Sequence, residues 1–410
     1  MTTRVAWLAD VHLGNHKAMG GPVDVGMNRR CREGLDVFRR AVALADELGC
    51  AAGVVLGDLF DYWRPEPQLI DAVRVVLKKA RARWYLLVGN HDQVSGRRGD
   101  HALAPLRGVA TVVDRPALIR VGGQVELALV PFVPERPARD WIAEALGTLE
   151  LSPYPRSVGV HAGVSDASTQ PWLASSLDQI PAQELAALAK RAGARAAFAG
   201  NWHSRKTWRL RANDQPPLRS RSSVDVVQVG ALVPTGWDNP GLEGYGGLAV
   251  WEPDRPHAVT CDLDEDCSCG HTGDVSFAEV AGPRFLSVRG LPEAERLFGA
   301  EAQEQMRAEG LDEEVCWWRV RATAGAGERD AVVALLRDAG LAGWEVLPDA
   351  DEVREEARGA AVAARSAETL DDAVGAFVGS MPLPVGLTDA DRPEVAALVR
   401  KYVAQGGARG

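Results

Sequence analysis

The 410-residue sequence has few cysteines and no long apolar run. Six cysteines over this length do not suggest a disulfide scaffold. Without about 18 consecutive apolar residues, the sequence has no candidate membrane span. The N-terminal stretch also lacks the apolar region and cleavage site of a signal peptide, so we expect a cytoplasmic protein. A G-x-x-x-x-G-K-[ST] phosphate loop is missing too, so the chain is not expected to hydrolyse ATP itself.

Basic residues are in deficit overall, and the net charge is −10. The deficit is confined to the C-terminal part. Residues 1–250 hold 30 Lys and Arg against 25 Asp and Glu, a net of +5, whereas the remainder holds 16 against 31, a net of −15. This asymmetry disfavours binding of a polyanion by the whole molecule but allows it in the N-terminal part.

Short apolar runs alternate with amphipathic helical patterns over the first 250 residues, which is typical of a layered α/β domain. Apolar residues at helical spacing predict a helix over 35–48, and Pro67 begins another. Gly122-Gly123 predicts a hairpin between strands 118–121 and 124–130. The other expected strands are residues 5–9, 52–56, 84–88, 157–160 and 195–199.

The length is too great for one ordinary core, and we predict three parts. Residues 1–281 form the α/β domain, 282–349 a small β-α-β-α-β unit, and 350–410 a charged linker and a helical tail. An apolar stripe in the tail either packs on its own chain or docks on a partner. It consists of Leu370, Val374, Phe377, Val395, Leu398, Val399 and Tyr402.

Three cysteines and one histidine lie close together in the sequence near residue 265. Cys261, Cys267, Cys269 and His271 are close enough in sequence to bind zinc. Their spacing lacks the paired C-x2-C of most structural zinc sites, and acidic residues surround them. We therefore favour an exposed acidic loop and keep zinc as the alternative.

Five polar motifs each follow a predicted strand. Because ligands bind beyond the carboxyl ends of the strands in an open α/β sheet, we expect the five to converge. Asp, His and Asn are ligands for divalent metals, and one carboxylate can bridge two cations. The pattern predicts a two-cation site for phosphoester hydrolysis. The motifs are Asp10-Val11-His12, Gly57-Asp58, Gly89-Asn90-His91-Asp92, His161 in GVHAG, and Gly200-Asn201-Trp202-His203.

These motifs resemble those of the calcineurin-like metallophosphoesterases. More narrowly, LADVHLGN, LGDLFDYW and VGNHD are similar to the SbcD-type nuclease subunits of double-strand-break repair complexes. The resemblance implies a four-layer β-sandwich flanked by helices, with a small α/β capping domain that binds DNA and a helical tail. It also implies an exonuclease and endonuclease in DNA repair or recombination. Its expected cofactors are two Mn²⁺, with Mg²⁺ as the alternative, and its expected partners are DNA, an SMC-like coiled-coil ATPase that binds the tail, and a second copy of the chain.

The same resemblance implies a role for each motif residue. Asp10, His12 and His203 correspond to ligands of the first cation, Asp58 bridges, and Asn90 and His161 hold the second. His91 stabilises the transition state and protonates the leaving oxygen. Asp92 orients His91.

One position departs from the family pattern G-H-x-H, which has a histidine where this chain has Asn201. An Asn carbonyl is a weaker, oxygen-only ligand, or it hydrogen-bonds a water ligand instead. We therefore expect a more loosely bound second cation, with activity retained at high metal concentration.

Basic residues follow three of the motifs, and we expect them to contact the DNA backbone, with a solvated face as the alternative. They are Arg29, Arg30, Arg97, Arg98, Arg205 and Lys206. His16 and His101 match no ligand position and are predicted at the surface, with substrate contact as the alternative. Asp61 is left open between capping a loop and supporting a ligand.

Two other functions remain open. One is a phosphatase or small-molecule phosphodiesterase on the same scaffold, which would need neither the basic residues nor the long C-terminal region. The other is a non-catalytic assembly subunit, in which Asn201 marks lost metal binding.

Overall fold

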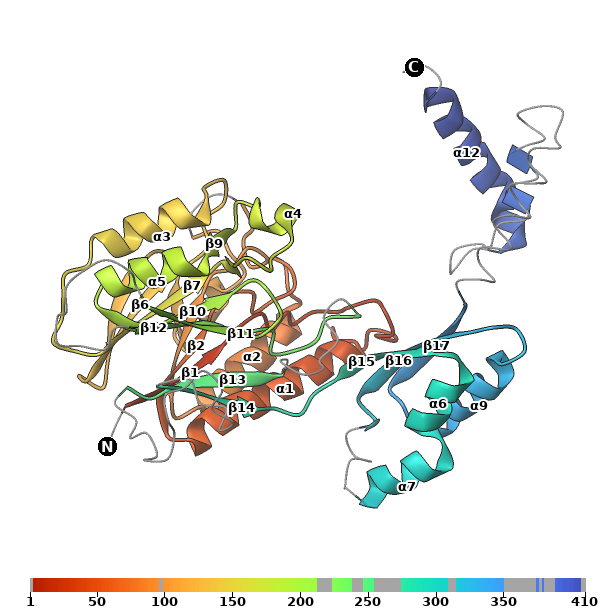
Figure 1. Cartoon of the computed structure of the whole chain (residues 1–410), viewed down its shortest axis with the longest axis horizontal. Coiled ribbons are helices and arrows are strands. Elements are labelled where there is room, and N and C mark those ends of the chain that lie inside the picture. Colours follow the sequence, from red (N-terminus) through yellow and green to blue (C-terminus); the bar gives the residue numbers. More distant parts are fainter. Residues whose placement is uncertain are drawn as a thin grey trace. The chain divides into compact units, whose positions relative to one another are not determined.

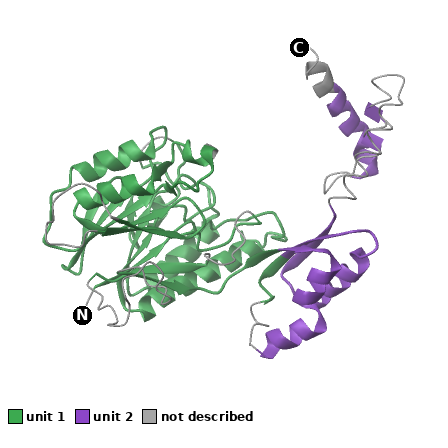
Figure 2. Cartoon of the chain, in the orientation of Figure 1, with its two compact units in different colours: residues 1–286, 313–319 green, residues 287–312, 320–410 purple. Residues whose placement is uncertain are grey.

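The structure is a computed structural model that describes residues 3–95, 99–211, 223–237, 246–253, 274–308, 315–349, 374–375, 378–379 and 388–406. The chain divides into two compact units (Figure 2). The first comprises residues 1–286 and 313–319, and the second comprises 287–312 and 320–410. Cys261, Cys267, Cys269 and His271 lie outside the described residues, as do Arg97 and Arg98.

The first unit contains a six-stranded sheet in the order β14-β13-β1-β2-β3-β4. Strands β1 to β4 run parallel, whereas β13 and β14 are antiparallel to their neighbours. The strands are β1 (Arg4–Leu8), β2 (Cys50–Val55), β3 (Arg83–Leu87), β4 (Thr111–Val113), β13 (Gly247–Trp251) and β14 (Val275–Glu279).

A second six-stranded sheet has the order β11-β12-β10-β7-β6-β5. Its four central strands are parallel, and its two edge strands are antiparallel to their neighbours. The strands are β5 (Ala117–Val121), β6 (Val125–Val130), β7 (Arg156–His161), β10 (Ala194–Gly200), β11 (Lys206–Arg211) and β12 (Ser223–Gln228). A small ribbon of β8 (Gly163–Ser165) and β9 (Gln179–Pro181) lies apart from it.

The two sheets pack face to face between layers of helices (Figure 1). Apolar side chains from both inner faces form the central core, in which Trp7 of β1 stacks on Phe198 of β10 at 4.3 Å. Separate cores join each sheet to the helices on its outer face. The four layers confirm the predicted metallophosphoesterase-type sandwich. The helices are α1 (Arg29–Glu47), α2 (Pro67–Lys79), α3 (Ala138–Gly147), α4 (Pro171–Ala174) and α5 (Ala182–Arg191), with the short η1 (Ala104–Leu106).

The start of α1 shows how a single cap sets a boundary. We expected this helix from residue 35, but it begins at Arg29. Asn28 has extended backbone angles, and its side chain accepts a hydrogen bond from the Cys31 N–H at 2.9 Å. This bond satisfies an N–H that would otherwise have no partner in the helix, so the helix extends back over its polar first turns.

A three-stranded sheet in the order β15-β16-β17 lies mainly in the second unit. It has the predicted β-α-β-α-β pattern, with buried Phe298 of α6 and Leu336 of α9 on the inner faces of these helices. The elements are β15 (Arg284–Arg289), α6 (Gly290–Phe298), α7 (Ala300–Ala308), β16 (Trp318–Ala324), α9 (Arg329–Asp338) and β17 (Gly343–Pro348).

A helix also forms in the C-terminal tail. It is α12 (Arg392–Gly406), preceded by the short η2 (Asp389–Asp391). Val395, Ala396 and Val399 pack against Val374 and Val378, so part of the predicted stripe lies on its own chain. Leu398 of the same helix is 55% exposed.

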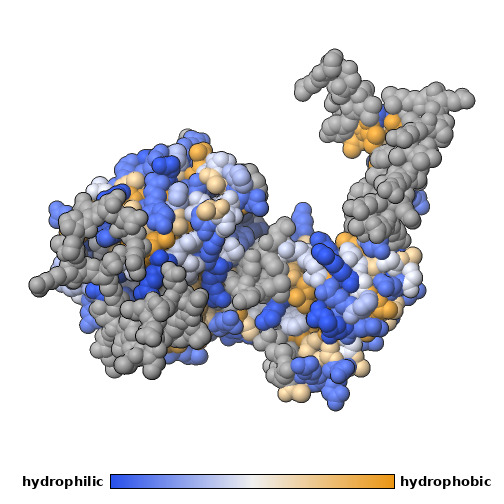
Figure 3. Space-filling model, viewed as in Figure 1, coloured by the Kyte–Doolittle hydropathy of each residue, from blue (hydrophilic) through white to orange (hydrophobic). Residues whose placement is uncertain are grey.

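The surface seen in Figure 3 is mainly hydrophilic over the described residues, with apolar side chains scattered among polar ones. In the described part of the chain, no helix combines the length and apolar character that crossing a membrane requires.

Candidate metal centre

The predicted site residues lie at the carboxyl ends of five parallel strands. Asp10 and His12 follow β1, Asp58 follows β2, and Asn90 and His91 follow β3 of the first sheet. In the second sheet, His161 ends β7, and Asn201 and His203 follow β10, the strand beside it. The ends of the two packed sheets therefore bring together side chains from nearly two hundred residues of sequence.

The loops that carry these side chains have unusual backbone angles. Four of the predicted site residues have positive φ: 48° at Asp10, 47° at His12, 51° at Asp58 and 93° at Asn201. The His12 N–H donates to the Asp58 carbonyl at 3.0 Å, which ties the first loop to the second. Non-glycine residues in this region of φ are strained, and such strain persists where the surrounding structure holds it for function.

Two glycines make the close approach of these loops feasible. A Cβ on Gly57 would collide with the imidazole of His161, and φ is +94° there. A Cβ on Gly89 would collide with the carboxylate of Asp58. Both positions need glycine because ligand side chains lie directly against the backbone.

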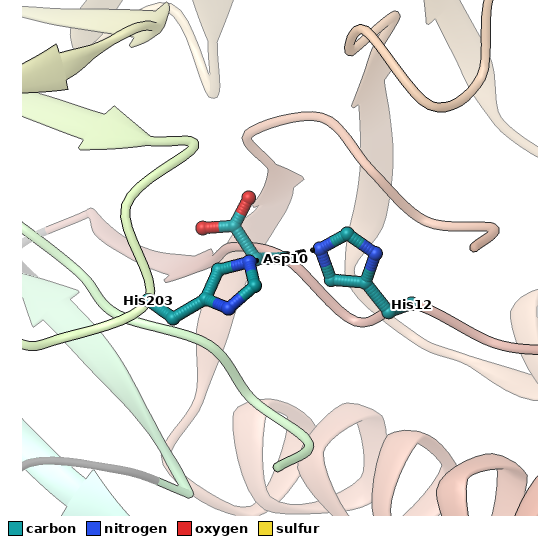
Figure 4. Close-up of side chains that lie close together, drawn as sticks. All are labelled: Asp10, His12 and His203. Atoms are coloured by element: carbon teal, nitrogen blue, oxygen red, sulfur yellow. Dashed lines mark hydrogen bonds between the residues drawn. The ribbon is translucent and has the colours of Figure 1, made fainter. Parts of the chain in front are cut away.

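The first cluster consists of Asp10, His12 and His203, whose side chains point toward one another (Figure 4). Their potential ligand atoms lie within 4.8 Å of one another. The Nε2 atoms of His12 and His203 are 3.1 Å apart. Asp10 and His12 are buried.

The second cluster consists of Asp10, Asp58 and His161, all buried. His161 Nε2 lies 3.5 Å from Asp58 Oδ2 and 2.7 Å from Asn90 Oδ1. The Nδ1 atom of His161 lies 2.5 Å from the Leu56 carbonyl oxygen, so Nδ1 carries the proton and donates it there. Nε2 of the neutral ring is therefore the nitrogen with a free lone pair.

The charges of the site stabilise positive charge inside a buried pocket. Burial lowers the pKa of His161, but Asp58 and Asp10 outweigh it and raise this pKa to about 9. Burial raises the pKa of Asp10 to about 6, although His161 opposes the change. Burial would raise the pKa of Asp58 as well, but His161, His12 and His91 hold it well below its usual range. A cation bound among these side chains would have the same favourable interactions.

The donor set fits two divalent cations. Two pairs of lone-pair atoms face each other, His12 Nε2 with His203 Nε2 and His161 Nε2 with Asn90 Oδ1, and each pair needs a proton or a cation between its atoms. Asp10 and Asp58 supply the negative charge. Asp58 lies near ligands on both sides, 3.9 Å from His12 Nε2 and 3.5 Å from His161 Nε2, as a bridging carboxylate must.

The sequence profile of one family, calcineurin-like phosphoesterase, matches residues 3–205. Residues 3–205 belong to the calcineurin-like phosphoesterases. This family uses a dinuclear metal centre, which the candidate ligands fit, and membership indicates a metal-dependent phosphoester hydrolase.

Several solved structures are similar to this chain. TT1561 of Thermus thermophilus is 15% identical, covering 62% of this chain and 95% of that one, with a TM-score of 0.39. A dimetal phosphatase from Danio rerio is 11% identical, covering 61% and 92%, with a TM-score of 0.36. The purple acid phosphatase PPD1 from yellow lupin (Lupinus luteus) seeds is 13% identical, covering 50% and 39%, with a TM-score of 0.34. No curated protein matches the chain.

Asp61 of the phosphoesterase domain supports the predicted ligands, a role that the sequence left open. Its carboxylate lies 3.3 Å from His12 Nδ1 and 3.5 Å from His16 Nδ1. Its main-chain carbonyl accepts a hydrogen bond from His91 Nδ1 at 2.7 Å. Asp61 thereby fixes the orientation of three imidazoles at once. The spacing of three residues after Asp58 is the signal that pointed to it.

The expected contact between Asp92 and His91 is corrected by the structure. The carboxylate of Asp92 is buried and accepts hydrogen bonds from the N–H groups of Phe60, at 3.2 Å, and Gly89, at 3.0 Å. Burial and the nearby Asp58 raise its pKa to about 7. Asp92 therefore joins the loops after β2 and β3. The partner of the His91 ring is the Asp61 carbonyl and not, as we expected, the carboxylate of Asp92.

The prediction that His101 lies at the surface was also wrong, whereas His16 is partly exposed. His16 Nε2 lies 2.9 Å from the His12 carbonyl, so His16 packs behind a predicted ligand. His101 is buried, with Nε2 3.7 Å from Asp114 Oδ2. Neither residue stands in a motif, and only the tertiary packing shows where they lie.

Asn201 does not present its amide nitrogen to the clusters. Its side-chain Nδ2 donates to Asp178 Oδ2 at 2.9 Å and to the Asp178 carbonyl at 3.3 Å. Its main-chain N–H donates to both carboxylate oxygens of Asp10, at 2.9 and 3.0 Å. Asn201 is therefore held by Asp178 through its side-chain amide and by the Asp10 carboxylate through its main chain.

The predicted DNA-contacting residues divide into two kinds. Arg30 is buried, donates to the Ala18 and Thr235 carbonyls and stacks on Phe285, which corrects its assignment to a binding surface. Arg29 is half exposed and pairs with Glu33 at 3.0 Å. Beyond His203, Lys206 is exposed and pairs with Asp166 at 2.6 Å, and Arg205 lies over the ring of Phe277.

Proposed function

We propose that this chain hydrolyses phosphodiester bonds of DNA in double-strand-break repair or recombination, with two Mn²⁺ as cofactors. The observation that carries the proposal is the exposure of His91 beside a centre whose residues Asp10, His12, Asp58 and His161 are buried. The main-chain N–H of His91 donates to Asp58 Oδ1 at 2.9 Å, and its exposed imidazole lies within 4.8 Å of the Asp58 carboxylate. A large substrate can approach there without entering a pocket.

The residues of the chain have separate tasks in this proposal. Asp10, His12, His203, Asp58, Asn90 and His161 would hold the two cations. The cations, when bound, supply Lewis acidity toward the phosphoryl oxygens and lower the pKa of water. His91 donates a proton to the leaving oxygen of the phosphodiester, while the Asp61 carbonyl holds Nδ1–H and fixes the ring.

DNA is favoured over a small ester for two reasons. The motifs LADVHLGN, LGDLFDYW and VGNHD resemble those of SbcD-type nucleases, and the chain continues past the phosphoesterase domain into a second unit and a tail. Arg205 and Lys206 follow His203 by two and three residues, and in this proposal they contact phosphates of the DNA backbone. A phosphatase of small esters requires none of these features.

Cleavage assays with two substrates test this proposal. Purified protein with Mn²⁺ is expected to nick or resect linear duplex DNA, and His91→Ala is expected to slow this about 10²- to 10⁴-fold. A chromogenic phosphodiester serves as the parallel substrate. Hydrolysis of that ester without any cleavage of DNA would reject the nuclease and favour the small-molecule phosphodiesterase.

The proposal includes an SMC-like ATPase as the partner of the tail. The exposed Leu398 on α12 is a candidate anchor for a groove on such a partner. We expect the ATPase to co-purify with the wild-type chain but not with Leu398→Asp. Equal recovery of the ATPase with wild type and with Leu398→Asp would show that Leu398 of α12 does not contact it.

A further inference from the structure

Gln228 is a buried residue at the end of β12, the strand that pairs with β10. Both ends of its side-chain amide have main-chain partners. Oε1 accepts a hydrogen bond from the Val164 N–H at 3.1 Å, and Nε2 donates to the Ser204 carbonyl at 2.5 Å. A main-chain N–H only donates and a carbonyl oxygen only accepts, so these partners fix which end of the amide points to which loop.

The two partners of Gln228 adjoin predicted cation ligands from different strands. Val164 stands three residues after His161, which ends β7, and Ser204 directly follows His203, which comes after β10. One buried amide therefore joins the main chain beyond one predicted ligand to the main chain beyond another.

Main-chain hydrogen bonds join the segment after Gln228 to loops of both sheets. The Ala231 N–H donates to the carbonyl of His203, beyond the second sheet, at 2.8 Å. The Leu232 N–H donates at 3.0 Å to the carbonyl of Ala9, which follows β1 of the first sheet and directly precedes a predicted ligand. The same short segment thus contacts ligand-bearing loops from each half of the site.

Gly230 allows this segment to approach the His203 loop closely. Its φ is +80°, and a Cβ at this position would lie 2.8 Å from the Arg205 main-chain nitrogen and 3.0 Å from the His203 carbonyl oxygen. A side chain here would displace one of the two segments, so the close approach depends on glycine.

We propose that Gln228, with Gly230 beside it, is a positioning residue of the cation centre. It acts on His161 and His203 through the main chain next to each of them. A metal site needs its ligands held within about 0.5 Å of the binding geometry, and ligands from separate strands depend on such links for their spacing. The inference rests on the dinuclear centre of the proposed function but not on DNA as the substrate.

The substitution Gln228→Met tests this role with little change of shape. Methionine is similar in length and adds no charge, but it leaves the Val164 N–H and the Ser204 carbonyl without their partner. Titration calorimetry on the full chain, with Mn²⁺ alone and without DNA, is the measurement. We expect the affinity for Mn²⁺ to fall about 10-fold, as when an outer contact of a metal ligand is lost.

Gln179→Met is the matched control. Gln179 is also buried, and its amide accepts from Ser165 Oγ at 2.5 Å and donates to the Ala174 carbonyl at 2.7 Å. Neither partner adjoins a predicted ligand. Both variants lose two hydrogen bonds and should melt at lower temperature in a chelator, but Gln179→Met is expected to bind Mn²⁺ as wild type does.

A second pair of variants tests the close approach at Gly230. Gly230→Ala and Gly108→Ala both place a Cβ at positive φ, +80° and +98°, but nothing lies within 4 Å of the Cβ at Gly108. The backbone strain is therefore shared, and the difference between them reports contact with the His203 loop. We expect Gly230→Ala to bind Mn²⁺ about 10-fold more weakly and Gly108→Ala to bind it as wild type does.

The visible absorption spectrum of bound Co²⁺ gives a readout that a loss of stability alone does not move, because it depends on the arrangement of the ligands. We expect it to change in Gln228→Met and Gly230→Ala and to stay unchanged in both controls. Thermal melting shows which variants are folded, and either pair decides if a member of the other does not fold.

Equal Mn²⁺ affinity and equal Co²⁺ spectra within the folded pairs would overturn the inference. A wild-type chain that binds no Mn²⁺ would overturn the cation centre and this inference with it. Binding as expected without cleavage of DNA would contradict only the nuclease proposal.

Discussion

The two sides of the cation site are built from similar ligands but are supported differently. On one side, His12 Nδ1 faces the carboxylate of Asp61 at 3.3 Å. On the other, His161 Nδ1 donates to the main-chain carbonyl of Leu56. Both partners fix the orientation of a ring, but a carboxylate also increases its basicity as a ligand. The comparison teaches that affinity at each position depends on what stands behind the ligand.

Substitution of Asp58, which lies between the two sides, should have the largest effect on phosphodiester hydrolysis. Asp58→Asn keeps the shape but removes the negative charge that two cations would share, so neither position is completed. We expect hydrolysis of a chromogenic phosphodiester with saturating Mn²⁺ to fall about 10³-fold or more, as when transition-state charge loses its stabilisation. Activity within 10-fold of wild type would mean that Asp58 does not bridge.

Loss of Asp61 should affect mainly the side of His12. Asp61→Ala removes the carboxylate behind His12, and we expect the affinity for Mn²⁺, measured by titration calorimetry, to fall about 10- to 100-fold. Asp166→Ala is the matched control, because that carboxylate contacts Lys206 and Trp208 rather than a predicted ligand. Equal affinity for Mn²⁺ in Asp61→Ala and in wild type would show that Asp61 does not support a cation ligand.

Much of the fold could be predicted because strong local patterns agree with the tertiary packing. β1, β2, β3 and the helix beginning at Pro67 follow from apolar runs and turn residues. Two elements, α3 and the edge strand β14, were not predicted. In β14 the side chains are only half buried, so its apolar pattern is weak. Its pairing with β13 forms it, and pairing partners far apart in sequence are not visible in a local pattern.

The sequence predicts which residues of the site meet, but it does not predict which neighbours fix their orientation. Asp10, Asp58, His161 and His203 converge as expected, because the ends of parallel strands meet at one edge. The mistaken contact of Asp92 with His91 arose from their adjacency in GNHD. In the structure, the turn directs Asp92 into the core, where two N–H groups need an acceptor. Arg30 was misplaced because a helix beginning at Arg29 turns that side chain inward.

The smallest expected effect compares the two sides through stability. A ligand that binds only the folded state stabilises it by about 2.7 kcal/mol at 100 times its Kd and by about 1.4 kcal/mol at 10 times. His203→Ala and Asn90→Ala should therefore each remove part of the rise in Tm caused by Mn²⁺. Melting each variant with Mn²⁺ and with a chelator isolates this increment from any change in the metal-free protein. A variant that kept the full rise in Tm would show that its side chain does not hold a cation.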